Sequence, residues 1–395
     1  MIVRHEFVIV GVVGLLSASG VGQVNLPEGF EIVEFMVSDD YTCVPSLNEC
    51  GQIVFCKRLG PSWADADIFL YDNGAIVRIT DNHDRDVNPR INNAGTIVWG
   101  RGIRDKGVTQ LVHLKDGREI ILDDNRLGVN SRVINNLGHV AWPRVLKRSC
   151  NTETEILLWK GRRTRVVVPH DGWTSQSPAL NDFDHMAWGR ADFCQNPWLG
   201  EIRLYREGET IVLPSEAKQA CVPSINNTGQ VAWLADGIEV WENGVTELLT
   251  DWGENPKLNN LGDILFARWH DELRSTDAWL YRVSNGDPTW HRLTDDGVLD
   301  TVGKINDAVE GAWRTLEDPP RGNWAGGVRF LRRIRTGDSQ FDGDIDLIDY
   351  AAFADCMTGP GRVDRLCECR FLDIDHDGDV DLSDFALFQI AFTDD

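Results

Sequence analysis

The chain is short of positive charge, of long apolar runs and of catalytic motifs. Its 395 residues hold 39 Lys and Arg against 62 Asp and Glu, so the formal net charge is −23. This field repels phosphate backbones and anionic headgroups and disfavours nucleic-acid binding. Beyond the N-terminus no apolar run approaches the about 18 residues of a membrane span, so we expect none. Nucleophile elbow, HExxH, Walker and dinucleotide motifs are also missing.

Residues 1–22 have the pattern of a secretory signal peptide. Arg4 precedes an apolar stretch from Phe7 to Leu16, and small residues such as Ala18 follow. A first core strand is the alternative. We therefore expect a secreted protein, extracellular or at the cell surface. In an exported chain most of the nine cysteines should be bridged, and their odd number leaves at least one free.

A polar turn motif recurs along the middle of the chain. Clear copies are NPRINNAGTIVW, VPSINNTGQVAW and NPKLNNLGDILF, and weaker ones include VPSLNECGQIVF and GKINDAVEGAW. The first Asn of the seven copies falls at Asn48, Asn92, Asn135, Asn181, Asn226, Asn259 and Asn306. The steps are 44, 43, 46, 45, 33 and 47 residues, which indicates one supersecondary unit repeated seven times.

Each repeat also carries an alternating hairpin such as DIFLYDNGAIVRIT. Together with the strands on either side of the Asn turn, this makes four strands per repeat. Four strands at this period predict a seven-bladed, all-β propeller over residues 23–335. The seventh repeat lacks a fourth strand, so we expect residues 30–36 to pair with a strand near Val328–Leu331 and close the ring.

The repeats resemble the TolB-like and HAF-type propeller repeats of secreted bacterial proteins, over about Phe30 to Arg335. The resemblance implies the architecture and no particular chemistry. The Asn-Asn-x-Gly segments are interpreted as turns rather than a functional polar ring. The repeated tryptophans that end the second strands are interpreted as core, at Trp99, Trp142, Trp188, Trp233 and Trp313.

The acidic tail, residues 336–395, contains two loops with calcium-ligand spacing. The second loop, DIDHDGDVDLSD, places Asp373, Asp375, Asp377 and Asp384 at positions 1, 3, 5 and 12, with a Gly at position 6. The first, DSQFDGDIDLID, supplies Asp338, Asp342 and Asp349 but has Gln340 at position 3. Each loop runs into a short apolar helix. We expect Ca²⁺ to bind both EF-hand-like loops, and the first more weakly.

Two loop-and-helix units at the end of an exported chain resemble a type I dockerin, over Gly337 to about Phe392. The resemblance adds the carbonyls of Asp379 and Asp344 to the two ligand sets and implies a cohesin-like partner. The partner-reading positions would be Leu347, Ile348, Leu382 and Ser383, which break the hydroxyl-rich pairing of well-known dockerins.

One face of the propeller collects charged and aromatic loop residues. Carboxylates at the blade junctions and basic residues after the second strands are expected to pair between blades; a polar ligand site in the central funnel is the alternative. Loop tryptophans beside them suggest stacking on sugar rings or a protein partner, or packing back on their own blades. The candidate ligand residues are Arg101, Arg190, Arg268, Trp198, Trp269 and Trp324.

Two function classes remain at this stage. The first is a secreted, non-catalytic binding protein for a polar ligand, carbohydrate or protein, tethered through its calcium-binding tail. The second is an extracellular polysaccharide-degrading hydrolase or lyase. We favour the first.

The face of the propeller on which each loop is expected to lie suggests which cysteines are bridged. Cys43 pairs with Cys56, Cys194 pairs with Cys221 or else with Cys150, and Cys356 pairs with Cys367 or Cys369. Cys50 is the expected free thiol, because it is placed at the opposite face.

Overall fold

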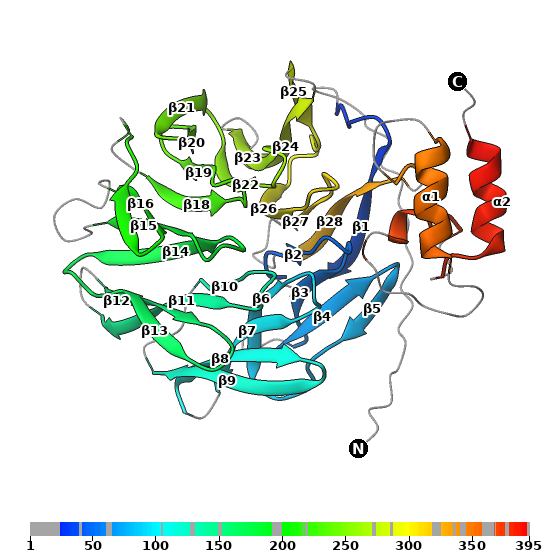
Figure 1. Cartoon of the computed structure of the whole chain (residues 1–395). Helices are drawn as coiled ribbons and strands as arrows, with labels where there is room; N and C mark the ends of the chain where they lie inside the picture. The colour runs from blue at the N-terminus through cyan, green and yellow to red at the C-terminus, as the bar shows by residue number, and fades with distance from the viewer. Residues whose placement is uncertain are drawn as a thin grey trace.

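The computed structural model of the protein describes residues 24–38, 42–60, 65–103, 106–126, 131–148, 152–191, 200–215, 217, 220–270, 274–284, 287–317, 325–334, 337–339, 345–357, 367, 369–375 and 379–392. The expected signal peptide lies outside these residues. The described part is a β-propeller-like fold with a short C-terminal helical region (Figure 1).

The described strands form five sheets, three of four strands and two of eight, and a parallel contact joins two groups of four in each eight-stranded sheet. The resulting seven groups of four are the blades. Blades 1 to 3 are β2 (Ser46–Leu47), β3 (Ile53–Arg58), β4 (Ala66–Asp72), β5 (Ala75–Arg78); β6 (Arg85–Ile91), β7 (Ile97–Ile103), β8 (Val108–Lys115), β9 (Arg118–Asn125); β10 (Val133–Ile134), β11 (Val140–Lys147), β12 (Glu153–Trp159), β13 (Thr164–Val168). Blades 4 and 5 are β14 (Thr174–Leu180), β15 (Met186–Ala191), β16 (Gly200–Arg206), β17 (Glu209–Val212); β18 (Cys221–Ile225), β19 (Val231–Leu234), β20 (Ile238–Glu242), β21 (Val245–Thr250). Blades 6 and 7 are β22 (Glu254–Leu258), β23 (Ile264–His270), β24 (Ser275–Ser284), β25 (Asp287–Arg292); β26 (Leu299–Ile305), β27 (Gly311–Glu317), β28 (Ala325–Arg333), β1 (Phe30–Ser38).

Blade 7 is completed by the N-terminal strand. β1 pairs antiparallel with β28, from Phe30 opposite Arg333 to Phe35 opposite Val328. This confirms the expected closure of blade 7 by the N-terminal strand. Phe35 then stacks on Tyr71 of blade 1, with ring centroids 4.4 Å apart, so the same strand also packs against the next blade.

The hydrophobic core lies between the blades. The five repeated tryptophans are almost fully buried, as predicted. Trp99 of blade 2, for example, packs with Val54 and Ile68 of blade 1, and Trp142 of blade 3 packs with Val98 of blade 2. The aromatic side chains of one blade are buried against the neighbouring blade. A blade therefore obtains the apolar burial that stabilises it only when it is assembled with its neighbours in the propeller.

The first asparagines of the seven turns form a closed hydrogen-bonded ring. Each Oδ1 accepts from main-chain N–H groups of its own turn, and each Nδ2 donates to the main-chain oxygen of the corresponding Asn in the next blade, across 2.9–3.3 Å. The turn interpretation is therefore correct but incomplete. The same buried side chains also link every blade to the next.

A second closed ring runs beside the first, through the following residue of each turn. Its main-chain N–H groups donate to the side chain of the equivalent residue in the next blade, across 2.7–3.1 Å. The link between blades 7 and 1 brings Glu49 close to Asp307. Burial and the charge of Asp307 raise the pKa of Glu49 to about 6.

The C-terminal region contains α1 (Leu347–Cys356), a short 3-10 turn η1 (Cys369–Phe371) and α2 (Leu382–Ala391). The two helices lie side by side (Figure 1), and Phe353 of α1 contacts Phe385 and Phe388 of α2. Both helices begin with a capping box, from Asp346 to Asp349 and from Asp381 to Asp384. No described helix is long and apolar enough to cross a membrane.

Candidate functional site

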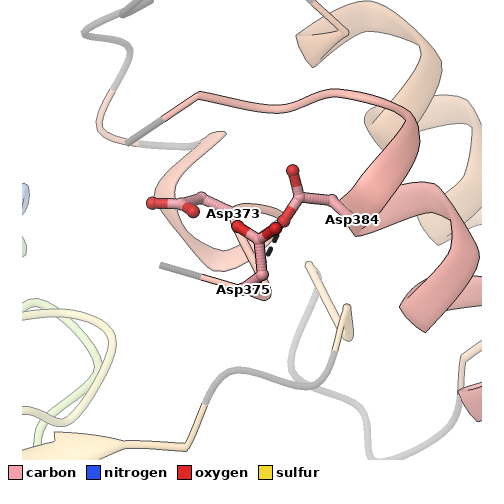
Figure 2. A group of neighbouring side chains, drawn as sticks. All are labelled: Asp373, Asp375 and Asp384. Atoms are coloured by element: carbon pink, nitrogen blue, oxygen red, sulfur yellow. Dashed lines mark hydrogen bonds between the residues drawn. The ribbon is translucent and has the colours of Figure 1, made fainter. Parts of the chain in front are cut away.

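The tail brings a group of carboxylates together at the start of α2. Oxygens of Asp373, Asp375 and Asp384 lie within 4.8 Å of one another (Figure 2), and Asp379, Asp381 and Asp384 form a second such group. Asp384 and Asp373 are buried, whereas Asp375 is exposed. Carboxylate oxygens on alternate residues of one loop are the donors that hard divalent cations prefer. The cluster can therefore hold a metal ion.

Local hydrogen bonds fix the shared carboxylate of this cluster. Asp384 Oδ1 accepts from the main-chain N–H groups of Ile374, at 2.6 Å, and Asp375, at 3.0 Å. Its Oδ2 accepts from Asp381 N at 2.9 Å, which completes the capping box. The helix start thus positions the closing carboxylate toward the loop.

The first loop has the same arrangement. Asp349 is fully buried and accepts from Ser339 N at 2.7 Å and from Asp346 N at 3.0 Å. Asp338 is also buried beside this helix start. The expected ligands Asp342, Asp344 and Asp377 lie outside the described residues, so the structure brings together only part of each set.

The tail is joined to the propeller by a disulfide and an ion pair, and the disulfide corrects the expectation for Cys50. Cys50, in the first Asn turn, is bridged to Cys367, so it is not a free thiol. Arg370 of η1 pairs with the buried Glu310 of the seventh Asn turn, with an Nη1–Oε1 distance of 3.2 Å. The tail folds back onto the Asn turns of blades 1 and 7, and this contact gives Cys50 a partner.

The remaining bridges are mixed in outcome. Cys43 pairs with Cys56 as predicted, and Cys356 pairs with Cys369, one of its two expected partners. Cys221 is free, so its predicted bridge to Cys194 is wrong. Cys150 and Cys194 lie outside the described residues. The three disulfides among the described residues indicate that the chain folds in an oxidising compartment, such as the periplasm or the extracellular space.

Two candidate arginines of the loop face are held by carboxylates. Arg101 pairs with Asp86 and Glu119, each at 2.9 Å. Arg190 pairs with Asp171 at 2.6 Å and Glu201 at 3.0 Å, and its guanidinium also lies over Trp173. The contacts of Arg101 lie within blade 2, and those of Arg190 lie within blade 4 and at the junction before it. The arginines are paired with carboxylates, but not from blade to blade as expected.

The loop tryptophans divide into two groups. Trp252 packs among Phe266, Trp279 and Trp290 of blade 6, and Arg268 stacks over Trp252. Trp252 therefore packs back on its own blade. Trp269, at the end of β23, remains 49% exposed. Trp198 and Trp324 lie outside the described residues.

A cavity lies at the centre of the ring, where the sequence suggested only a central funnel as an alternative ligand site. It has a volume of about 340 Å³ and is lined by the inner strand segments of all seven blades. Arg90, Arg132, Lys257 and Lys304 line it. Arg90, Lys257 and Lys304 each lie two positions before a ring Asn, so the repeat places them at equivalent positions in their blades. That signal was missed, and Arg132, one position earlier in its repeat, does not follow it.

No protein-family profile matches the chain, and no curated protein matches it. Among solved structures, the chain is similar to the β-propeller domain of the Trilobed protease from Pyrococcus furiosus. The TM-score is 0.53 at 9% identity, over 73% of this chain and 93% of that one. Puromycin hydrolase gives a TM-score of 0.51 at 10% identity, over 72% of this chain and 51% of that one. TolB from Acinetobacter baumannii gives 0.42 at 12% identity, over 65% of this chain and 64% of that one.

The first two likenesses establish a β-propeller fold and nothing further, because identities near 10% carry no activity from one propeller to another. The chain spans about half the length of puromycin hydrolase and under two thirds of TolB. No family profile, of dockerins or of any other kind, covers the tail.

Proposed function

We propose that the protein is a secreted, non-catalytic binding protein whose propeller presents a ligand face and whose dockerin-like tail binds calcium. The observation that carries the proposal is the duplicated carboxylate arrangement around Asp349 and Asp384. Two loops with the same closing carboxylate, each capping a helix, suit a module whose order depends on two hard cations.

The ion-paired arginines support binding over catalysis. Arg101 and Arg190 are engaged by carboxylates and so are positioned as fixed charges. Trp269 of β23, which is half exposed, is suited to stack on a sugar ring or a partner's side chain. We infer that the ligand is a carbohydrate or a protein surface that contacts this tryptophan.

Calcium titration of the full chain tests the tail. Metal-free protein should bind Ca²⁺ by calorimetry, and amides of α1 and α2 should exchange more slowly with Ca²⁺ than with chelator, because a ligand that binds only the folded form stabilises it. Asp375→Asn should weaken second-loop binding about tenfold or more, since it removes an exposed ligand charge without touching the core.

Asp355→Asn is the matched control, because Asp355 is exposed on α1 and belongs to neither loop. Its binding should equal that of the unmodified chain. Equal calcium affinity in the Asp375 variant, or no calcium binding by the full chain, would contradict the proposal.

The ligand face is tested with polysaccharides. Affinity electrophoresis against a panel of plant and algal polysaccharides should show retardation that Trp269→Ala removes. Phe183→Ala, at an exposed aromatic in an Asn turn of blade 4, serves as the control. Release of new reducing ends from any polysaccharide would replace binding with catalysis.

The tail also exposes apolar side chains where a partner would dock. Leu347 is 73% exposed and Leu382 72% exposed, each at the first residue of its helix. A cohesin-like partner would cover both. Leu382→Asp should abolish capture of such a partner, whereas Ile390→Asp, at the far end of α2, should not.

A further inference from the structure

The central cavity has a repeated geometry. The side chain two positions before each ring Asn lines it, one from every blade, namely Ser46, Arg90, Val133, Ala179, Ser224, Lys257 and Lys304. Arg132 joins them from the segment that precedes β10. Its volume of about 340 Å³ falls in the range of ~300–1,000 Å³ typical of small-molecule sites.

Four cations meet in this cavity, and no described residue that lines it is acidic. Arg90 Nη1 donates to the main-chain oxygen of Pro89 at 2.8 Å, and Lys257 Nζ donates to Asn255 Oδ1 at 2.6 Å. Lys304 makes no hydrogen bond and no ion pair within the described part of the chain. In a protein of net charge −23, such a concentration of positive charge is unusual and costly.

The cations disfavour one another electrostatically. Burial and the charge of Arg90 lower the pKa of Lys257 to about 7 and that of Arg132 to about 9. Burial also lowers the pKa of Lys304, although carboxylates of the second turn ring, led by Glu49, partly oppose the shift. The ring carboxylates do not line the cavity. They therefore do not neutralise the positive charge of the four cations inside it.

A backbone irregularity recurs in the inner strands of the ring, in the neutral β14 and β18 as well as in strands that carry cations. The register of β6 shifts between Val87 and Arg90, and that of β22 shifts between Glu254 and Lys257. Asn88 and Asn255, each two residues before a cation, adopt left-handed φ values of 52° and 55°. The bulge is therefore a feature of the repeat, and it occurs just before the residue of each of these strands that lines the cavity.

The cavity is also asymmetric. The cations come from blades 2, 3, 6 and 7, on either side of blade 1, whereas blades 4 and 5 contribute small neutral side chains such as Ala179, Pro223 and Ser224. A ligand that fits would place anionic groups toward the first set and a neutral part toward the second.

We propose that the central cavity binds a small organic anion that carries two or more carboxylate, phosphate or sulfate groups. Oxyanions form charge-assisted hydrogen bonds with Lys and Arg and remove their mutual repulsion. The site is distinct from the loop face and the calcium loops, so it stands or falls independently of the function proposed above.

The test uses the full chain after its metal has been removed on a chelating resin, in metal-free buffer without soluble chelator, so that neither the calcium loops nor a polycarboxylate chelator contributes. Citrate, inorganic phosphate and sulfate are titrated by calorimetry, with acetate and chloride at matched ionic strength as references. We expect saturable binding of at least one multivalent anion. Lys304→Met should weaken it about tenfold, and Lys257→Met combined with Lys304→Met should abolish it.

A second readout separates a binding role from a structural one. Without a multivalent anion, Lys304→Met should melt at a higher temperature than the unmodified chain, because it removes one charge from a repelling cluster. Lys115→Met, at an exposed position of β8, is the control and should change neither binding nor melting. Identical responses to all five anions, unchanged affinity in both lysine variants, or destabilisation by Lys304→Met in anion-free buffer would overturn the proposal.

Discussion

Asn306 Nδ2 donates to the main-chain oxygen of Asn48, 258 residues earlier in the chain, across 3.3 Å. This bond joins the last Asn turn to the first and closes a ring that passes through every blade. The strand pair β1 and β28 closes the same junction through the sheet. Two independent devices therefore hold the two ends of the propeller together.

The ring predicts that an Asn-to-Asp change will be destabilising even though it preserves the turn. In Asn181→Asp the Oδ1 acceptor for Phe183 N and His185 N remains, but the donor to Asn226 O is lost. We expect a loss of about 1–3 kcal/mol in the free energy of unfolding, measured with urea, since a buried carbonyl loses its partner.

Asn243→Asp is the matched control for this change. Asn243 is an exposed turn residue outside the ring, with a left-handed φ of 50°. Its variant should unfold like the unmodified chain. Equal stability of the Asn181 and Asn243 variants would mean that the ring contributes nothing beyond the turns.

Closure by β1 predicts a large effect of one aromatic side chain. Phe35 is buried between β28, Tyr71 and Phe55, so Phe35→Ala should reduce the free energy of unfolding by about 3–5 kcal/mol. Phe183→Ala, at a side chain that is 65% exposed, should have little effect. A chain that lacks the residues up to Ser38 should also melt less cooperatively. An unchanged melting transition would contradict the closure of blade 7 by β1.

The bridge from Cys50 to Cys367 predicts that the tail and the propeller share stability. Non-reducing peptide mapping should recover these two cysteines in one linked peptide. Cys367→Ser should speed hydrogen exchange in α1 and α2 and lower the free energy of unfolding by about 2–4 kcal/mol, because the bridge closes a long loop. Cys221→Ser, at the free thiol, should change neither. Unchanged exchange in the Cys367 variant would show that the bridge does not hold the tail.

The depressed pKa of Lys257 predicts a pH dependence of stability. The pKa falls from its usual 10.5 to about 7 in the folded chain, because of burial and of Arg90 across the cavity. Between these values the unfolded chain binds more protons, so this group's destabilising effect is fully present below about pH 7 and fades as the pH rises toward 10.5.

Urea unfolding of the unmodified chain and of Lys257→Met measures this effect. The variant should be the more stable at about pH 6, and the difference should shrink by about pH 10. Lys115→Met should show no such trend. A difference that stays constant with pH would mean that Lys257 is neutralised by a partner.

The blades were predictable because their signals are local. Strand alternation, hairpin turns and the Asn turn recur within each repeat, and counting strands left one missing in blade 7, which the N-terminal strand supplied. The burial of Trp99 and its equivalents could also be predicted from position alone. A large apolar side chain at the same place in each repeat is buried in the same way in each blade.

The disulfides and the tail contacts were harder to predict. Cys43 and Cys56 lie 13 residues apart on adjoining segments, so proximity followed from the repeat. Cys50 and Cys367 are 317 residues apart, and nothing local indicates that the tail returns to the first Asn turn. Glu310 and Arg370 pair for the same reason, through a docking that the repeat pattern does not encode.

The sequence by itself determined the repeat, the strands of each blade and the spacing of the carboxylates in the tail, because backbone conformation and ligand spacing depend on neighbours along the chain. Only the tertiary structure decided that the ring asparagines bond from blade to blade and that Arg90, Lys257 and Lys304 face one cavity. Those contacts arise when seven inner strands are brought around a common axis, and a side chain's partner across that axis is set by ring closure.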